Sequence, residues 1–370
     1  MSRTSKKKKL LYIVESMGGG VFTYIVSMAN ELVRTYDLYV AYGLRPETPA
    51  NYESYFHPAV HLIRVKSFKR QIDPVQDVKA FWEIRRIGKI VEPDVIHLHS
   101  SKAGALGRLA FNGKRVPLFY TPHGYSFLMN NCSRIKRLFY REIEALCARR
   151  RCVTLSCSAG EHQESVKLTK WGEQVDSGID PENLKQILSS EKNIPHPFTV
   201  FTLGRIDEQK NPDLFNKIAK SMPDVQFLWI GDGHLREHLN APNIQVTGWM
   251  EHREALQRGF HADVFILTSL WEGLPIALLE AMYMKKLCIV SNSIGNRDVI
   301  HHGENGFVCN SVNDYVIAIN LARNGEGAEQ TERAYSEILN HYNIKSMAEQ
   351  YASLYETYWN KIHRIYSSPF

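Results

Sequence analysis

The sequence predicts an α/β protein with two parallel-sheet domains of the Rossmann type. Short apolar runs typical of buried strands alternate along the whole chain with longer segments in which apolar residues recur at helical spacing. A length of 370 residues also exceeds one ordinary domain and favours two. We place the first domain at residues 1–185 and the second at residues 186–345, with the connection between them inside 181–197.

The composition is that of a globular protein with an ample core, because 44% of the residues are hydrophobic and 11% are aromatic. No apolar run approaches the roughly 20 residues that a membrane span needs, and the run 10–14 is too short for the core of a signal peptide. A cytoplasmic protein is therefore expected. The six cysteines form no C-x2-C pair, which argues against zinc and a disulfide framework and favours buried thiols.

Charge is divided unevenly between the two halves of the chain. Residues 1–190 hold 29 Lys and Arg against 18 Asp and Glu, whereas residues 191–370 hold 16 against 21. A first half this basic suggests an anionic partner, either a membrane surface or a nucleic acid.

The first domain opens with a strand predicted over 10–14, followed by Gly18, Gly19 and Gly20 and then by a helix. The apolar face of this helix consists of Val21, Ile25, Met28, Ala29 and Leu32. A strand, a glycine turn and a helix can cradle a phosphate, because glycine lets the backbone approach a ligand closely and the helix start offers free N–H groups.

The rest of the first domain continues the alternation. Strands are predicted at 37–42, 60–65, 94–99, 118–121 and 152–157, and helices at 77–91, 102–111 and 133–151. Ser100 or Ser101 is expected to cap the second of these helices. Ser158 and Glu161 are expected to form a capping box after the last strand.

Three histidines lie at the ends of neighbouring strands. His97 and His99 close the strand 94–99. Both can be structural residues, one buried and one near the strand tip, and we favour this interpretation for His97. His123 follows the strand 118–121, at the carboxyl edge where open α/β sheets bind ligands. A histidine there can hydrogen-bond a hydroxyl group or shield developing charge, so His123 is a candidate site residue.

The helix predicted at 133–151 is basic and amphipathic. Its apolar stripe consists of Ile135, Leu138, Phe139 and Leu146, and the basic residues around it are Arg134, Lys136, Arg137, Arg141 and 149–151. Such a helix suits an anionic membrane surface, which would contact 134–151. A helix that packs its stripe on the core and leaves a solvated basic face has the same pattern, and both interpretations stay open.

The second domain repeats the alternation from a strand at 198–203. A loop then carries Gly204, Arg205 and Lys210, and Asn211 with Pro212 is expected to start a helix. Further strands are predicted at 225–230, 244–250, 264–267, 287–291 and 306–309, and a final helix at 344–366.

The stretch 269–280 is the most informative of the chain. It follows an apolar strand and holds Glu272 beside a Gly-Leu-Pro turn and Glu280 in a helix that starts near Ile276, with Pro275 at the first helical position. Free N–H groups at the helix start form an anion site, and two flanking carboxylates accept hydrogen bonds from hydroxyl groups. A nucleotide sugar has both features. Two solvated surface carboxylates would show the same spacing.

Three motifs resemble a known family. The spacing Glu272-x7-Glu280 with Gly-Leu-Pro inside it, and GRIDEQKN at 204–211, resemble the signatures of the retaining glycosyltransferases of family 4, which have the GT-B fold. HLHSSKAGALGRLA at 97–110 is similar to bacterial sugar transferases that assemble capsule or O-antigen. The resemblance implies two Rossmann-like domains with a cleft between them, and a C-terminal helix, 346–370, that packs back on the first domain.

The resemblance also implies the site residues. It gives catalytic roles to His123, Glu272, Arg205 and Lys210. His123 would lie beside the donor sugar and Glu272 would hold its hydroxyl groups. Arg205 and Lys210 would clamp the donor diphosphate, the first as a bidentate fork and the second as a point charge. The implied donor-binding residues are Gly19, Gly20, Gly204, Arg205, Lys210, Trp249, Met250, Glu272, Gly273, Leu274, Pro275, Ile276 and Glu280, the last on the ribose hydroxyls.

The implied activity is transfer of a sugar, with retention, from a nucleotide-diphosphate sugar to a saccharide acceptor, with a UDP-sugar as the expected donor. The chain contains no D-x-D triplet, so a bridging metal ion is not implied. No other cofactor is expected. A basic first domain favours a lipid-linked acceptor and a protein that is peripheral on the inner face of a bacterial membrane.

Two other classes of protein stay open. A sugar-nucleotide epimerase with the GT-B fold would share the architecture, although Arg205, Lys210 and the two glutamates favour the transferase. A non-enzymatic nucleic-acid or scaffold protein would use the basic half. The chain carries no recognised nucleic-acid motif, so no nucleic-acid partner is expected.

Overall fold

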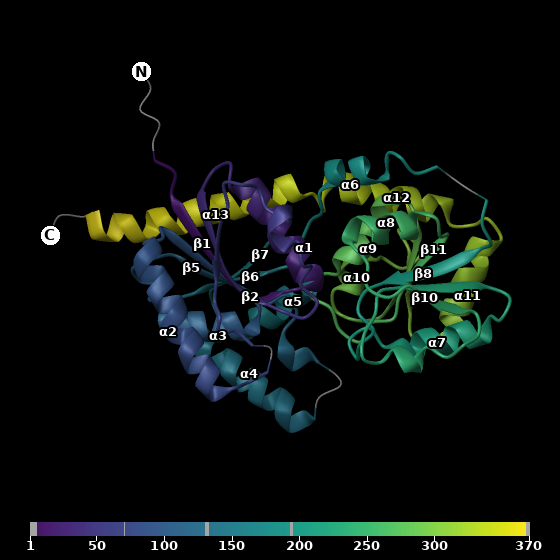
Figure 1. Ribbon diagram of the computed structural model, residues 1–370, viewed down its shortest axis with the longest axis horizontal. Coiled ribbons are helices and arrows are strands. Elements are labelled where there is room, and N and C mark those ends of the chain that lie inside the picture. The colour runs from purple at the N-terminus through teal and green to yellow at the C-terminus, as the bar shows by residue number, and fades with distance from the viewer. Residues whose placement is uncertain (1–5, 70, 130–132, 193–194, 368–370) are drawn as a thin grey trace, which may run out of the picture. The chain divides into compact units, whose positions relative to one another are not determined.

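The computed structural model describes residues 6–69, 71–129, 133–192 and 195–367 (Figure 1). The chain divides into two compact units. The first comprises Met1–Phe127, Arg134–Asp176 and Ile344–Phe370, and the second comprises Leu128–Ser133 and Ser177–Asn343. Each unit is built on one parallel sheet, so the α/β class predicted from the sequence is confirmed.

The first unit holds a sheet of seven parallel strands in the order β3-β2-β1-β4-β5-β6-β7. These are β1 (Lys9–Met17), β2 (Asp37–Leu44), β3 (His61–Arg64), β4 (Val95–His99), β5 (Leu118–Thr121), β6 (Val153–Ser156) and β7 (Gly172–Gln174). The chain steps outward from β1 to β3, crosses back to β4 and then steps outward the other way. The strand order therefore reverses between β1 and β4, and ligands of open α/β sheets bind beyond the carboxyl ends of the strands at such a point.

Helices cover both faces of this sheet (Figure 1). They are α1 (Gly19–Leu32), η1 (Tyr52–Tyr55), α2 (Pro74–Val91), α3 (Ser101–Ala110), η2 (Ser126–Leu128), α4 (Arg134–Ala148), α5 (Ala159–Ser165) and α13 (Ile344–Ser367). Helix α3 packs against both α2 and α4, and α13 packs against α1. The last helix of the chain is therefore part of the unit that contains its first strand.

The core of the first unit joins β1, α1 and α13. Tyr12 and Val14 of β1 are fully buried, and Tyr351 and Tyr355 of α13 are buried in the same cluster. The Tyr24 hydroxyl of α1 donates to the Tyr351 hydroxyl at 2.8 Å. A buried phenol needs such a partner, because an unpaired hydroxyl in an apolar core is costly.

The second unit holds a sheet of six parallel strands in the order β10-β9-β8-β11-β12-β13. The strands are β8 (Thr199–Leu203), β9 (Gln226–Ile230), β10 (Ile244–Val246), β11 (Val264–Leu267), β12 (Leu287–Ser291) and β13 (Phe307–Cys309). Here the order reverses between β8 and β11. The side chains of Phe215, Trp229 and Ile266 lie in its core cluster.

The helices of the second unit are α6 (Pro181–Leu188), α7 (Pro212–Ser221), η3 (Arg236–His238), α8 (His252–Phe260), α9 (Ile276–Tyr283), α10 (Asn296–Val299), α11 (Val312–Arg323) and α12 (Ala328–Asn340). Within the described parts of both units, no helix is long and apolar enough to cross a membrane.

Capping side chains set where two helices begin. Helix α2 starts at Pro74, before the predicted residue 77, because the Asp73 carboxylate accepts a backbone N–H of the first turn. Helix α7 starts at Pro212 and is capped by Asn211, as the sequence predicts. In both cases the proline occupies a position whose N–H needs no partner.

One predicted cap and one predicted capping box are wrong. Ser100 stands at the N-cap of α3, but its φ of 74° gives a backbone in which its hydroxyl makes no capping bond. The Ser158 hydroxyl does accept the Glu161 N–H of α5, at 3.3 Å, but the Glu161 carboxylate does not return to Ser158. It accepts the N–H groups of Gly124 and Cys157 instead, at 2.7 and 2.9 Å.

Five cysteines are free, buried thiols, as the sequence predicts: Cys147, Cys152, Cys157, Cys288 and Cys309. Burial raises the pKa of Cys152 to about 12, so this thiol stays protonated. The sixth, Cys132, lies outside the described residues.

Candidate active site

The switch point of the second sheet carries two loops that are fixed to each other. Residues 204–211 connect β8 to α7, and residues 268–275 connect β11 to α9. Both loops leave the carboxyl ends of neighbouring strands. The Thr268 hydroxyl donates to the carbonyl oxygen of Lys210 at 2.7 Å, which ties the end of one loop to the start of the other.

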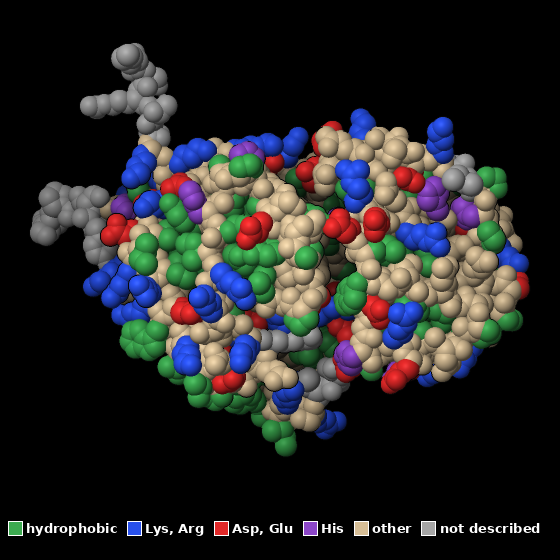
Figure 2. Space-filling model, in the orientation of Figure 1, with side chains coloured by type: hydrophobic (Ala, Val, Ile, Leu, Met, Phe, Trp, Pro, Cys, Tyr) green, Lys and Arg blue, Asp and Glu red, His purple; other side chains and the backbone are tan. Residues whose placement is uncertain are grey.

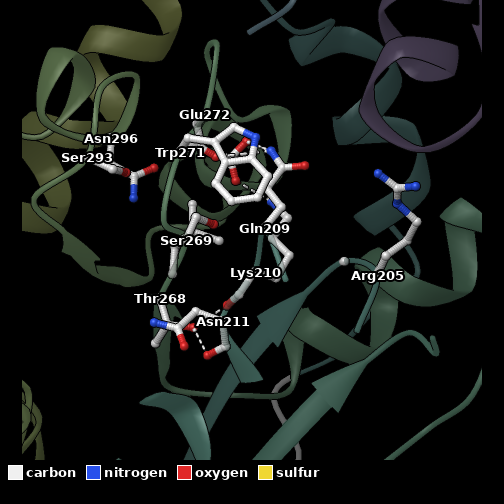
Figure 3. Close-up of polar contacts among 12 residues, drawn as sticks. Arg205, Gln209, Lys210, Asn211, Thr268, Ser269, Trp271, Glu272, Ser293 and Asn296 are labelled. Carbon is white, nitrogen blue, oxygen red and sulfur yellow. Dashed lines mark hydrogen bonds and ion pairs between the residues drawn. The ribbon is translucent and has the colours of Figure 1, made fainter. Parts of the chain in front are cut away.

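Lys210 and Glu272 meet across these loops. Lys210 Nζ lies 2.6 Å from Glu272 Oε1, and Gln209 Nε2 donates to Glu272 Oε2 at 3.0 Å and to the Trp271 carbonyl at 3.1 Å. Figure 3 shows Gln209, Lys210 and Trp271 gathered around Glu272. Only 7% of the Glu272 side chain is exposed. It is therefore a buried carboxylate paired with Lys210 and not a solvated surface carboxylate.

The second carboxylate, Glu280, is buried as well. It lies inside α9, and its Oε1 is 2.7 Å from Nε2 of His252, the first residue of α8. Burial opposes the charged imidazolium, but the nearby Glu280 carboxylate outweighs it, so the pKa of His252 is raised. The E-x7-E spacing thus places two buried acceptors in one unit, one paired with Lys210 and the other with His252.

The turn before α9 is backed by a second loop. Pro275 has extended ψ of 112° and stands at the N-cap, so the prediction that it is the first helical residue is wrong by one position; α9 begins at Ile276. Gly295 has φ of +85°, and a Cβ there would lie 2.5 Å from the Gly273 carbonyl and 2.9 Å from Glu272 Cβ. Only glycine allows this close approach. Helix α9, whose first N–H groups have no partner inside the helix, begins four residues after Glu272.

The remaining donor-binding candidates of the second unit lie at the same edge of its sheet. Gly204, with φ of +151°, is the first residue after β8, and Arg205 follows it. The Arg205 guanidinium is 3.4 Å from Asp207 and stands apart from the Lys210–Glu272 pair (Figure 3). Trp249 and Met250 follow β10, and the Trp249 side chain is 59% exposed.

In the first unit, His123 follows β5 in a left-handed backbone conformation. Its φ is +56°, which is uncommon for a residue with a side chain and is found where surrounding contacts impose it. The contact is the next residue, Gly124, whose N–H donates to the buried Glu161 carboxylate. Burial raises the pKa of Glu161, while the Cys157 and Gly124 N–H groups favour its charged form.

The three histidines form a stack below this loop. His97 and His99 have ring centroids 4.1 Å apart, and His99 and His123 have centroids 5.3 Å apart. His99 Nδ1 lies 3.1 Å from His123 Nε2. Burial holds the pKa of His97 and of His99 well below the usual range and lowers that of His123 to about 3, so all three rings are neutral near pH 7.

The glycines that follow β1 lie at the switch point of the first sheet, where the strand order reverses between β1 and β4. Gly18 is the extended N-cap of α1, and Gly19 and Gly20 are exposed in the first turn of that helix. Gly19 has φ of +54°, a conformation that glycine adopts without a steric penalty. Among the described residues, no group of three His, Cys, Asp or Glu side chains is arranged to hold a metal ion.

Two family models match the chain on either side of the unit boundary. The model of the glycosyl transferase 4-like domain matches residues 19–169, and that of the glycosyl transferases group 1 matches residues 185–337. The chain belongs to the GT-B glycosyltransferases.

Individual relatives agree with this family. The glycosyltransferase is 28% identical to the UDP-Gal:alpha-D-GlcNAc-diphosphoundecaprenol alpha-1,3-galactosyltransferase of Escherichia coli, over 81% of this chain and 85% of the relative. It is 23% identical to the GalNAc-alpha-(1->4)-GalNAc-alpha-(1->3)-diNAcBac-PP-undecaprenol alpha-1,4-N-acetyl-D-galactosaminyltransferase of Campylobacter jejuni, over 85% of this chain and 88% of the relative. Its fold resembles sucrose-phosphate synthase from Thermosynechococcus elongatus, with a TM-score of 0.80, 16% identity and coverage of 96% and 100%.

Sequence reasoning missed three residues of the glycosyltransferase's candidate site. Gln209 lies inside the GRIDEQKN motif but was given no role, and His252 lies far in sequence from the Glu280 that it contacts. His99 was not among the predicted site residues, yet it contacts His123 directly. The signal for His99 was its position at the end of β4, the strand beside the one that leads to His123. No sequence signal links His252 to Glu280.

Proposed function

We propose that this glycosyltransferase moves a sugar, with retention, from a UDP-sugar to a lipid-linked saccharide in the synthesis of bacterial capsule or O-antigen. The observation that carries the proposal is the buried Lys210–Glu272 pair at the switch point of the second sheet. The relatives support it. The name of the Escherichia coli relative gives UDP-Gal as donor and a diphosphoundecaprenol-linked sugar as acceptor, and that of the Campylobacter jejuni relative also gives an undecaprenol-linked acceptor.

The Lys210–Glu272 pair has the chemistry to exchange partners with the donor. The oxygens of a diphosphate would compete with Glu272 for the Lys210 ammonium, and the α9 start would supply N–H groups. Glu272 would then have one oxygen free to accept a sugar hydroxyl, while Gln209 holds the other. Glu280 would accept the ribose hydroxyls, and Arg205 would add a bidentate contact to the diphosphate.

The transfer step needs charge stabilisation on the leaving group. The acceptor hydroxyl would attack the anomeric carbon from the face on which the diphosphate leaves. The bond from that carbon to the phosphate oxygen breaks, a bond to the acceptor oxygen forms, and the leaving phosphate takes the acceptor's proton. Lys210, Arg205 and the start of α9 would neutralise the charge that develops on the diphosphate, which is the part a metal ion plays in other enzymes. His123 would hydrogen-bond the transferred sugar.

The deciding experiment is slow hydrolysis of a panel of UDP- and GDP-sugars by the wild-type protein and by Lys210→Ala. We expect release of UDP from one UDP-sugar, retention at the anomeric carbon by NMR with a supplied acceptor, and loss of turnover in the variant. Conversion of the UDP-sugar to its epimer would instead favour an epimerase. Absence of any turnover, together with a gel shift on nucleic acid, would favour the non-enzymatic alternative.

The orientation of helix α4, which exposes its apolar residues, supports a lipid-linked acceptor. In α4 the buried residues are Glu144 and Cys147, whereas the apolar residues Ile135, Leu138, Phe139 and Leu146 are 82%, 59%, 54% and 62% exposed. The interpretation of this stripe as core-facing is therefore wrong. Glu144 accepts hydrogen bonds from the buried Arg108 at 2.6 Å and from the Tyr120 hydroxyl at 2.9 Å, so a polar cluster anchors α4 to its unit.

The exposed apolar surface extends beyond α4. Among the described residues, fourteen large hydrophobic side chains are exposed, and ten of them lie between residues 72 and 146. On α2 they include Val75, Val78 and Trp82, which share one helix face. Figure 2 shows hydrophobic and basic side chains close together over α2 and α4. Apolar residues with interspersed Lys and Arg fit the interface of an anionic membrane, where the acceptor lipid is anchored.

A further inference from the structure

His99 and His123 are joined by a contact between two ring nitrogens that has the length of a hydrogen bond. Their nitrogens Nδ1 and Nε2 are 3.1 Å apart, a hydrogen-bond distance, and the rings are tilted by only 24°. A hydrogen bond between two imidazole nitrogens requires one N–H donor and one bare acceptor. Because burial keeps both rings neutral, each ring carries a single proton, and the direction of this bond fixes the tautomer of both.

The other nitrogen of His99 decides the direction. His99 is fully buried, and its Nε2 has no hydrogen-bond partner among the described residues. If His123 were the donor, the proton of His99 would sit on Nε2 as a buried, unpaired N–H, which folded proteins almost never keep. If His99 is the donor, Nε2 is left with a bare lone pair, which is tolerated more often. The second arrangement puts the proton of His123 on its Nδ1.

The stack is held from below, so this arrangement is rigid. His97 Nδ1 is 2.6 Å from the Tyr355 hydroxyl of α13, and His97 Nε2 is 2.9 Å from the Thr121 hydroxyl. With both its nitrogens bonded, the His97 ring cannot turn without breaking a contact. His99 stacks on it, and the Tyr24 ring packs against His123 with centroids 4.6 Å apart.

We propose that His99 is a positioning residue that holds His123 in the Nδ1–H tautomer. His123 is only partly buried, so its Nδ1–H is the polar group that this ring offers to a substrate. It presents an uncharged hydrogen-bond donor, and its ligand is an acceptor oxygen of the bound donor substrate. The inference rests on the proposed function for the identity of that substrate, but the tautomer itself does not depend on it.

The tautomers are measured directly by ¹⁵N NMR of the full-length protein labelled at histidine, near neutral pH. The signals are assigned with the variants His99→Phe, His99→Asn and His123→Asn, and with the exposed His61→Asn as a surface control. We expect His123 and His99 both to be protonated at Nδ1 in the wild type. A wild-type His123 protonated at Nε2 overturns the proposal, whatever the activity of the enzyme.

Kinetics separate positioning from a purely structural role. The amide of His99→Asn places an N–H donor near the position of Nδ1, so His123 should keep its tautomer and kcat should stay within about threefold of wild type. His99→Phe keeps the ring but removes the donor. We expect it to leave the His123 tautomer unfixed, so that the Nε2–H form also becomes populated, and to lower kcat by up to roughly tenfold, the size of one hydrogen bond at a reacting group. Equal kcat in the two variants, at equal thermal stability, would show that the contact positions nothing. If the wild type hydrolyses no nucleotide sugar, the proposed function fails while the NMR result stands.

Discussion

The two units place their charges in opposite ways. In the first unit, the carboxyl edge of the sheet holds three histidines that burial keeps uncharged, while Arg134 and Arg141 lie on the outer surface of α4. In the second unit, the same edge holds two buried carboxylates, one paired with Lys210 and the other with His252, whose pKa is raised by Glu280. Buried ions are costly unless they are paired, so the second unit keeps charge where a diphosphate would need it. The first unit keeps its cations where a lipid surface would need them.

The largest expected effect is on membrane binding and concerns the basic residues of α4 in the first unit. We expect the wild type to float with anionic vesicles at low salt, and changing Arg134, Lys136, Arg137 and Arg141 to Glu to reduce this binding by more than a hundredfold. Each Lys or Arg near such a surface is worth about 1 kcal/mol, within a Debye length. Hydrolysis of the donor should survive, because its proposed charged residues belong to the second unit. A wild type that stays free of anionic vesicles would remove the membrane from the proposal.

The next largest effect is on turnover and concerns Lys210 and Arg205 of the second unit. Lys210→Ala and Arg205→Ala should each lower turnover at saturating acceptor by at least tenfold, since a charge-assisted hydrogen bond is worth about 1.5–3 kcal/mol. The two variants should differ in stability. Arg205 is 30% exposed, so its loss should leave the melting temperature nearly unchanged, whereas Lys210→Ala leaves the buried Glu272 without its cation and should lower it.

A double variant serves as the control for Lys210. Lys210→Met with Glu272→Gln removes both charges and should recover most of the melting temperature without recovering activity. Recovery of activity along with stability would mean that Lys210 acts on the fold alone.

The histidines of the two units should make stability depend on pH in opposite directions. Burial lowers the pKa of His123 to about 3. Its contribution to stability is therefore full above the unfolded pKa of about 6.5 and is lost as the pH falls from there toward about 3. The pKa of His252 is raised, because Glu280 outweighs burial, so its contribution is full below about 6.5 and is lost as the pH rises through the raised value. Melting temperatures of His123→Asn and His252→Gln across pH, each compared with wild type, should show these opposite slopes. Parallel slopes would contradict the difference between the units.

The smallest expected effect is that of chelation. If Lys210, Arg205 and the α9 start neutralise the leaving diphosphate, EDTA should change turnover by less than about twofold. Loss of activity that added Mn²⁺ or Mg²⁺ restores would mean that a metal ion does this work.

The α/β alternation, and with it the fold, could be predicted because apolar strands and amphipathic helices leave local patterns. The strand–turn–helix at 269–280 was predictable for the same reason, and so was the cap of α7 by Asn211. Burial of Glu272 and Glu280 was not, because the spacing is the same for solvated carboxylates and only the packing of neighbouring loops excludes water from them.

Contacts between distant segments were beyond local patterns. His252 meets Glu280 across 28 residues, and His97 meets Tyr355 across 258. The prediction of a capping box at Ser158 was wrong for a related reason. The Glu161 carboxylate accepts the N–H groups of Gly124 and Cys157 and not the N–H of Ser158 at its own helix start. The orientation of α4 was also undecided, because a stripe of apolar residues does not say whether its partner lies inside or outside the protein.

The placement of α13 sets an order of events during synthesis. The second unit ends at Asn343, so all of its strands have left the ribosome before the last helix emerges. The first unit, although its strands are made first, lacks Tyr351 and Tyr355 in its core until α13 has been made. Domains tend to fold as units during translation, so the half made later can mature first. Because Tyr355 holds His97, the histidine stack can close only after α13 has been made. A chain cut short before α13 would therefore present a formed second unit and an unfinished first one, a form that proteases would recognise readily.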